Sequence, residues 1–203
     1  MADYDYPEEV AGPFEAPPIA FTDKEGREIE VQVCEDEHFE PLVEMYVTFD
    51  PSDRAQGLPP ARESRVRSWL DTILNEGQDV VAVDVSGSDA PGDQPEASAS
   101  DDGRESADSG SGNGERVVGH ATLVPDENDA VELAIFVHQD YQGAGIGSKL
   151  IRGLLGYGER EGIEKVWLTV ERWNHPAVHL YESVGFESSS VESFEREMTL
   201  RLR

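Results

Sequence analysis

A glycine-rich loop lies between an apolar run and a helical pattern in the second half of the chain. The apolar run ends at Val137, and the loop continues into a helix. The first N–H groups of a helix have no partner within it, and the helix dipole is positive at this end, so a loop of this kind favours a phosphate group. Glycines let the phosphate approach the backbone. A phosphate-containing ligand is therefore predicted at Gln142-Gly143-Ala144-Gly145-Ile146-Gly147.

Two common nucleotide-binding loops do not fit this spacing. A Rossmann fingerprint requires Gly-x-Gly-x-x-Gly, but the third glycine, Gly147, comes one position early. A P-loop requires Gly-Lys-Ser/Thr, whereas Gly147-Ser148-Lys149 separates the glycine from the lysine and has no hydroxyl after it. An ordinary strand-to-helix turn without a ligand remains open for the loop taken alone.

Together with a segment downstream, the loop resembles the GNAT superfamily of acyl-CoA N-acyltransferases. The pyrophosphate loop of that family is Gln/Arg-x-x-Gly-x-Gly/Ala, which Gln142, Gly145 and Gly147 match. The stretch Asn-His-Pro-Ala-Val-His-Leu-Tyr-Glu-Ser-Val-Gly-Phe at 174–186 looks like the family's Asn-x-x-Ala-x-x-Leu-Tyr-x-x-x-Gly-Phe. The resemblance covers about residues 29–200, apart from a low-complexity insertion.

The resemblance implies acetyl-CoA as a co-substrate and assigns roles to the matching residues. The backbone of Ile135, Phe136 and Val137 would pair with the pantetheine arm as an added strand. The amides from Gly143 to Ser148 would hold the pyrophosphate, and the Asn174 side chain would touch the arm. The implied reaction moves an acetyl group to a primary amine of a small molecule or peptide. The rival class is a non-catalytic acyl-CoA sensor, which would keep the loop but would need no acid.

Transfer from a thioester to an amine needs a neutral amine, a stabilised oxyanion and a proton for the departing thiolate. Tyr181 is the candidate acid. Its unperturbed pKa is about 10, against about 8.5 for a thiol, so it holds its proton at neutral pH. The alternative is that Tyr181 is a core residue beside Leu180.

The base is predicted with less support from the resemblance. Some members of the family carry a glutamate five residues before the asparagine, where this chain has Thr169, and threonine cannot accept the proton. Glu132, on the strand before the loop, is the candidate instead. The alternatives are that Glu132 is a solvated carboxylate without a role, or that a water chain takes the proton.

The acceptor is expected between the strands that splay near the loop and the segment 46–60, which carries Asp50, Asp53 and Arg54.

Several other kinds of site are not expected. His175 and His179 have the i,i+4 spacing of a metal pair, but there is no His-Glu-x-x-His pattern and no third ligand, so no metal is predicted. A basic track for nucleic acid is absent. Cys34 is alone and lies in a strand-like setting, which favours an inert buried thiol over a nucleophile and fits a reducing cytoplasm. We expect a cytoplasmic location, because no apolar run could span a bilayer and the acidic start lacks the basic region of a secretory signal.

The chain is very acidic, with 43 Asp and Glu residues against 16 Lys and Arg and a formal net charge of -27. Only Lys24, Lys149 and Lys165 are lysines. This pattern is typical of proteins from a salt-loaded, halophilic cytoplasm, where charges are screened within about 3 Å at molar salt. The alternative is attraction for cationic substrates.

Apolar periodicity predicts one α/β domain with a mixed, mostly antiparallel sheet and helices on both faces. Residues 1–20 look like an acidic, proline-containing tail, and 21–203 look like the acyltransferase domain. A Ser/Gly/Asp segment at 86–114 interrupts it as a greatly lengthened hairpin loop, solvated and disordered, with partner docking as the alternative. Monomer and homodimer both remain open. The expected order is β-α-α-β-β-β-α-β-α-β, with strands at 28–34, 79–85, 117–124, 131–137, 165–170 and 193–200 and helices at about 39–46, 61–75, 145–161 and 174–184.

Overall fold

The computed structural model describes residues 5–51, 58–87, 116–127, 129–192 and 194–203. Nearly all of the predicted 86–114 insertion therefore lies outside the described residues. Its flanking strands, β3 (Gln78–Asp84) and β4 (Arg116–Pro125), are antiparallel neighbours. Two strands that adjoin in this way have the pairing expected of a hairpin with a long connection.

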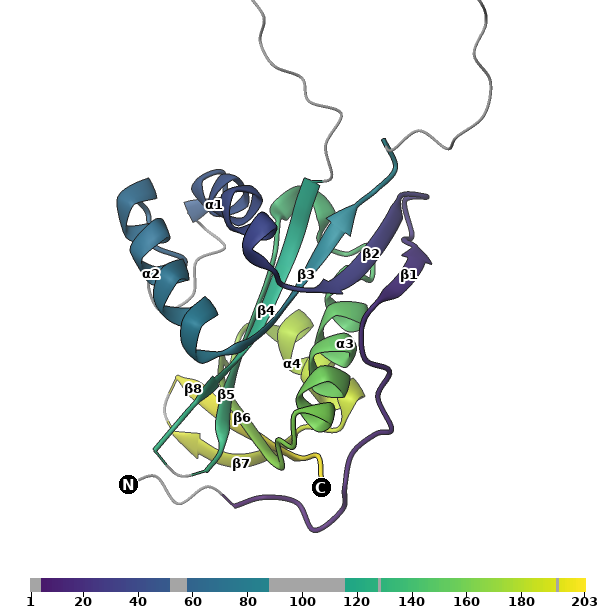
Figure 1. Cartoon of the computed structure of the whole chain (residues 1–203). Helices are drawn as coiled ribbons and strands as arrows, with labels where there is room; N and C mark the ends of the chain where they lie inside the picture. Colours follow the sequence, from purple (N-terminus) through teal and green to yellow (C-terminus); the bar gives the residue numbers. More distant parts are fainter. Residues whose placement is uncertain (1–4, 52–57, 88–115, 128, 193) are drawn as a thin grey trace, which may run out of the picture.

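One sheet of eight strands runs through the molecule in the order β1-β2-β3-β4-β5-β6-β8-β7 (Figure 1). Every neighbouring pair is antiparallel except β5 and β6, which are parallel. The predicted mixed, mostly antiparallel sheet is confirmed. The remaining strands are β1 (Ile19–Thr22), β2 (Glu28–Val33), β5 (Val131–Val137), β6 (Lys165–Glu171), β7 (Glu187–Glu192) and β8 (Glu195–Arg201).

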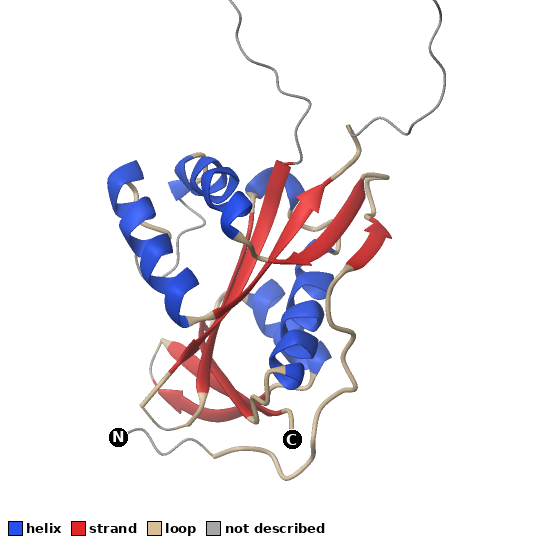
Figure 2. Cartoon of the chain, in the orientation of Figure 1, coloured by secondary structure: helices blue, strands red, loops and turns tan. Residues whose placement is uncertain are grey.

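Helices cover both faces of the sheet, as predicted (Figure 2). On one face α1 (Phe39–Val47) and α2 (Glu63–Glu76) bury an apolar cluster against β3 and β4 that includes Tyr46, Leu70 and Val81. On the other face α3 (Ile146–Arg160) and α4 (His175–Val184) share a larger cluster with the inward side chains of the strands. Alternation along each strand sends successive side chains to opposite faces, so the sheet separates the two clusters.

The parallel pair β5 and β6 diverges soon after it begins. Only Val131 with Val166 and Glu132 with Trp167 are in register. Beyond Glu132, strand β5 still pairs with β4 on its other side up to Val137, but its edge toward β6 is open. The divergence leaves backbone N–H and C=O groups of β5 free to face whatever lies between the two strands.

Two strands were missed by the sequence pattern. β1 begins inside the predicted tail, and β7 precedes the predicted final strand, which is β8. The N-terminal residues 5–18 contain no helix or strand but are packed on the body: Ala11 N–H donates to the Arg201 carbonyl at 2.8 Å, and the Thr199 hydroxyl donates to the Asp5 carbonyl at 2.8 Å.

The N-terminal segment also lies against α3. A Cβ on Gly156 would stand 2.6 Å from the Glu15 carbonyl, so the close approach of the two segments requires glycine at this position. Among the described residues, no helix is long and apolar enough to cross a membrane.

Candidate active site

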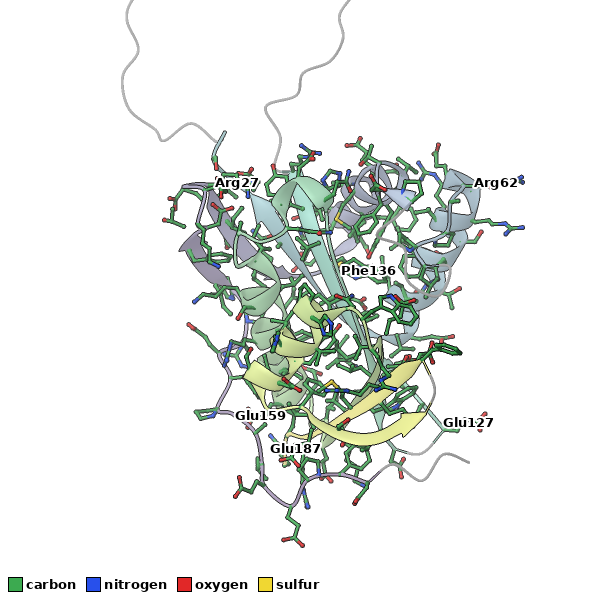
Figure 3. The ribbon with its side chains drawn as sticks, turned by 180° about the vertical axis from the view of Figure 1, so that it is seen from behind. Arg27, Arg62, Glu127, Phe136, Glu159 and Glu187 are labelled. Carbon is green, nitrogen blue, oxygen red and sulfur yellow. The ribbon has the colours of Figure 1, made fainter. Side chains whose placement is uncertain are left out.

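A cleft of about 510 Å³ opens where β5 and β6 diverge. Its walls come from these two strands, the glycine loop and the start of α4. Phe136, one of the lining residues, is labelled near the middle of the molecule in Figure 3. Eleven of the predicted site residues line this cleft: Glu132, Ile135, Phe136, Val137, Gln142, Gly143, Gly145, Gly147, Ser148, Asn174 and Tyr181.

The glycine loop has the backbone conformation that its sequence predicts. Gly143 and Gly145 have φ of 75° and 95°, a region that residues with a Cβ rarely adopt, and α3 begins at the next residue, Ile146. Ala144 and Ile146 do not line the cleft, because their side chains are buried in the core. Any contact they make with a ligand there must therefore come from their backbone.

The open edge of β5 is partly closed at its end. The Gln142 side chain donates from Nε2 to the Val137 carbonyl at 3.1 Å, so this oxygen already accepts one hydrogen bond. The backbone of Leu133 to Phe136 remains available on the side that faces β6. An extended chain with amide groups could pair with this edge as an additional strand.

Tyr181 lies in α4 with its ring against Phe186, at 5.9 Å between ring centroids, and only 8% of the residue is exposed. Its hydroxyl makes no hydrogen bond with any described residue, yet the residue lines the cleft. Burial raises the pKa of Tyr181 to about 12. Tyr181 can therefore be both a core residue and a candidate acid, because its ring packs in the core while the residue also lines the cleft.

Glu132 is exposed at the point where the two strands part, and it lines the cleft together with Thr169. Desolvation, and then the nearby Asp126 carboxylate, raise the pKa of Glu132. Asp126 in turn accepts a hydrogen bond from the Trp167 indole N–H at 3.0 Å. A carboxylate with a raised pKa is a better proton acceptor than one at its ordinary value.

Asn174 is the N-cap of α4. Its Oδ1 accepts a hydrogen bond from the Ala177 N–H at 3.3 Å, which stabilises the helix start and fixes the side chain. The amide NH₂ group makes no hydrogen bond within the described part of the chain, and the residue lines the cleft. One end of this side chain can cap the helix while the other meets a ligand.

The segment predicted to contact the acceptor contributes Phe49 and Leu58 to the cleft. The Gln139 side chain fixes its entry, because Nε2 donates to the Thr48 carbonyl at 2.9 Å and Oε1 accepts from the Asp50 N–H at 3.1 Å. Asp53 and Arg54 lie outside the described residues. The acceptor side of the cleft is therefore apolar as far as it is described on this segment.

Lys24 and Glu171 also line the cleft and were not predicted. Glu171 ends β6, where the alternation of that strand could have placed it beside Thr169. Lys24 lies in the turn between β1 and β2, far from the loop in sequence. The only sequence signal for it was that the chain has just three lysines. Both add charge to a cleft that is otherwise mostly apolar.

No group of three or more His, Cys, Asp or Glu side chains able to hold a metal occurs among the residues that the structure describes. His175 and His179 are both exposed. Cys34 is partly buried, and burial followed by the Asp79 carboxylate raises the pKa of its thiol to about 12. A thiol in this state is a poor nucleophile.

Comparison with known proteins agrees with this geometry. Residues 89–186 match the model of the acetyltransferase (GNAT) family. The [ribosomal protein bS18]-alanine N-acetyltransferase of Escherichia coli is 36% identical over 64 residues, which is 32% of this chain and 43% of that enzyme. The chain thus aligns with less than half the length of this curated relative.

Solved structures resemble nearly the whole chain. The GNAT domain of PAT from S. lividans has a TM-score of 0.63 at 14% identity, covering 93% of this chain and all of that domain. The structure of yncA from Salmonella typhimurium with its cofactor acetyl-CoA has a TM-score of 0.58 at 17% identity, covering 86% and 94%. The fold is the GNAT fold, and a part of the sequence, residues 89–186, is similar to the GNAT acetyltransferase family.

Proposed function

We propose that the chain is an N-acetyltransferase that moves an acetyl group from acetyl-CoA to a primary amine. The observation that supports this most is the meeting of three parts in one cleft: the open edge of β5, the glycine loop and Tyr181. Each part serves a different need of the reaction, namely alignment of the donor, binding of its phosphates and stabilisation of the departing sulfur.

The residues of the cleft suit an acyl-coenzyme. Its volume of about 510 Å³ is within the range of about 300–1,000 Å³ usual for small-molecule sites. A Cβ on Gly147 would have its nearest neighbours, Leu180 Cδ2 and Val137 Cγ2, at 3.5 and 3.7 Å, so packing does not require glycine there. A phosphate that comes close to the backbone of Gly147 would require glycine at this position, because a Cβ would occupy its space. The amides from Gly143 to Ser148 would hold the pyrophosphate, and Ile135 to Val137 and Asn174 would hold the arm.

When bound, acetyl-CoA supplies an activated acyl group as a thioester. Tyr181 would stabilise the departing sulfur by donating a hydrogen bond to it, and the released thiolate would then take its proton from solvent. With a pKa of about 12, against about 8.5 for a thiol, full transfer of the proton is uphill by about 3.5 units, or about 5 kcal/mol. Tyr181 therefore acts best as a hydrogen-bond donor to the sulfur as negative charge develops on it.

Glu132 would accept the proton from the amine. It lies on the same face of β5 as Phe136, the face toward α1 and α2 where the acceptor would enter, whereas α4 carries Tyr181 on the other face. Acid and base on opposite faces of the same opening can act on the two ends of the reacting group. A water between Glu132 and the amine can complete the path.

The acceptor is proposed as a primary amine of a peptide or small molecule. The E. coli relative is named for an alanine of a ribosomal protein, which favours a peptide amine. An α-amino group has a pKa of about 7.7–8.0 and is partly neutral at pH 7, whereas a lysine amine is almost fully protonated. An α-amino acceptor would therefore depend less on proton removal by Glu132. We place the enzyme in a salt-rich cytoplasm, as a monomer or homodimer.

Calorimetric titration of acetyl-CoA in molar KCl, followed by thiol release across a panel of amines, tests the proposal. The expected result is saturable binding and turnover on at least one amine. Gly147→Ala tests the loop, because its Cβ fits the fold but would enter the space of the ligand. This variant should bind acetyl-CoA weakly and keep the melting temperature of the parent protein. Binding without turnover on any amine would favour a sensor, and no binding would reject the function.

A further inference from the structure

We infer that Lys24, in the turn between β1 and β2, is a coenzyme-binding residue whose ammonium group pairs with a phosphate of the acyl donor. The inference rests on the proposed function, because it concerns the same cleft. It adds a second element, from the N-terminal part of the chain, to a phosphate site that would otherwise consist of loop amides alone.

The position of Lys24 is the first observation. The residue lines the cleft, and its Nζ lies 3.5 Å from the Gly143 carbonyl oxygen, at the long limit of a hydrogen bond. Its Cε would be 3.8 Å from a Cβ on Gly145. The side chain therefore extends along the two glycines whose positive φ shapes the loop, and an anion held by the loop amides would lie beside the ammonium group.

The turn is fastened to the loop by its backbone as well. Lys24 N–H donates to the Ala144 carbonyl at 3.1 Å, inside the loop. Arg27, labelled in Figure 3, donates to the Asp140 carbonyl at 3.1 Å, just before the loop, and its guanidinium stacks on the Tyr141 ring at 4.0 Å. Contacts on both sides of the loop leave little freedom for the turn to move away from it.

Asp23 holds the turn in shape from within. Its side chain is fully buried and accepts hydrogen bonds from the N–H groups of Glu25 at 2.8 Å and Arg27 at 3.0 Å and from Arg27 Nε at 2.7 Å. A carboxylate that satisfies this many donors neutralises Arg27 and fixes the backbone on either side of Lys24. The Arg27 side chain is thus held by Asp23 and the Asp140 carbonyl, whereas the Lys24 side chain has only its long contact with the Gly143 carbonyl.

Charge is the second observation. Three charged residues line the cleft, Lys24, Glu132 and Glu171, so Lys24 is the one cation among the described lining residues. No carboxylate of the described chain lies within ion-pair distance of its Nζ. In a chain with a net charge of -27, a polyanionic ligand is repelled over most of the surface. An unpaired cation at the phosphate end of the cleft offsets that repulsion locally.

The ligand chemistry is a phosphate group, and the coenzyme offers two sources: the pyrophosphate that the loop would hold and the 3′-phosphate of its adenosine. Calorimetric dissociation constants for acetyl-CoA and 3′-dephospho-CoA, measured at several KCl concentrations and compared at each, separate them. The variants are Lys24→Gln, Lys24→Arg and the control Lys165→Gln, which removes the same charge outside the cleft.

We expect Lys24→Gln to weaken acetyl-CoA binding about tenfold, the size of one charge-assisted hydrogen bond. Lys24→Arg and Lys165→Gln should bind within about twofold of the parent, and the salt dependence of the Lys24→Gln dissociation constant should be shallower. An equal loss with 3′-dephospho-CoA assigns the contact to the pyrophosphate, and a loss seen only with acetyl-CoA assigns it to the 3′-phosphate.

A parent protein that binds acetyl-CoA while Lys24→Gln binds equally well overturns the role of Lys24 and leaves the proposed function standing. A parent protein that binds neither coenzyme overturns both. Because Lys24 is exposed, its replacement should not alter folding, and a thermal melt of each variant checks this.

Discussion

The Tyr46 hydroxyl lies 2.6 Å from Nδ1 of His120, in the core between α1 and β4. The second ring nitrogen of His120, Nε2, lies 2.9 Å from Asp79 Oδ1. Tyr46 and His120 have no exposed surface, and Asp79 has very little. Burial, and then the Asp79 carboxylate, raise the pKa of Tyr46 well above its ordinary value, so it remains a phenol. The two ring nitrogens of His120 thus join the Tyr46 hydroxyl and the Asp79 carboxylate in one buried polar chain.

This polar chain supports the acceptor side of the cleft. Tyr46 packs edge-on against Phe136, at 5.5 Å between ring centroids, and Phe136 lines the cleft. Tyr46→Phe should lower the free energy of unfolding by about 1–3 kcal/mol, because Nδ1 of His120 is left buried without a partner. Urea denaturation measures the loss. Tyr157→Phe, at a tyrosine that is only partly buried, should change stability by less than about 0.5 kcal/mol, and an equal loss in both variants would contradict the role of the pair.

Replacing Tyr181 tests the proposed acid. Tyr181→Phe should lower kcat by about 10²–10³-fold, the usual effect of removing one hydrogen-bond donor to developing negative charge, and leave the acetyl-CoA dissociation constant unchanged. Because the hydroxyl makes no hydrogen bond with the described chain, the melting temperature should also stay the same. Steady-state kinetics with the best amine of the panel supply the measurement. Unchanged turnover would mean that Tyr181 does not stabilise the departing sulfur.

The pH dependence of the reaction tests Glu132. Its pKa is raised by desolvation and by Asp126, so the acidic limb of the kcat/KM profile should lie above the ordinary glutamate value of about 4.3, and the rate should fall as the pH drops through it. Glu132→Gln should remove that limb and lower kcat/KM by about 10²–10⁴-fold.

The sign for stability is opposite to that for activity. A raised pKa means that the folded state disfavours the carboxylate, so this group's stabilising contribution is present at low pH and is lost as the pH rises through the raised pKa. Glu132→Gln should therefore be at least as stable as the parent at pH 7. A variant that loses activity through unfolding would show the reverse in a thermal melt.

We propose that the acidic surface is an adaptation to high salt. In dilute buffer the mutual repulsion of 43 carboxylates is poorly screened, and the folded state should be destabilised. A loss of about 3 kcal/mol would lower the melting temperature by roughly 6–12 °C for a chain of this size. Melts in dilute buffer and in molar KCl make the comparison. Equal melting temperatures in the two would remove this interpretation.

Periodicity located most elements of the fold within a few residues, because their apolar faces are strong signals. It missed β1 and β7 for different reasons. Ile19–Thr22 is a four-residue edge strand that directly follows a proline, and Glu187–Glu192 is serine-rich without apolar alternation, so its strand state comes from pairing with β8.

The site was predictable where its residues lie within local motifs. The loop and the α4 segment each have a sequence pattern, and most of the residues named from them line one cleft. Lys24 belongs to no motif, since its place beside Gly143 depends on the docking of a turn about 120 residues away in sequence. Ala144 and Ile146 belong to the loop, but their side chains are buried in the core and do not line the cleft.

The sheet is continuous across β5 and β6 through two residue pairs only. The sheet therefore has two parts, one of β1 to β5 and one of β6, β8 and β7, which are joined by this short parallel pairing. Side chains from both parts, such as Leu123 and Leu168, are buried in the same cluster under α3 and α4, so the packing of this cluster holds the two parts together. In the proposed reaction, the size of acyl group or amine that fits would therefore depend in part on buried residues that do not line the cleft.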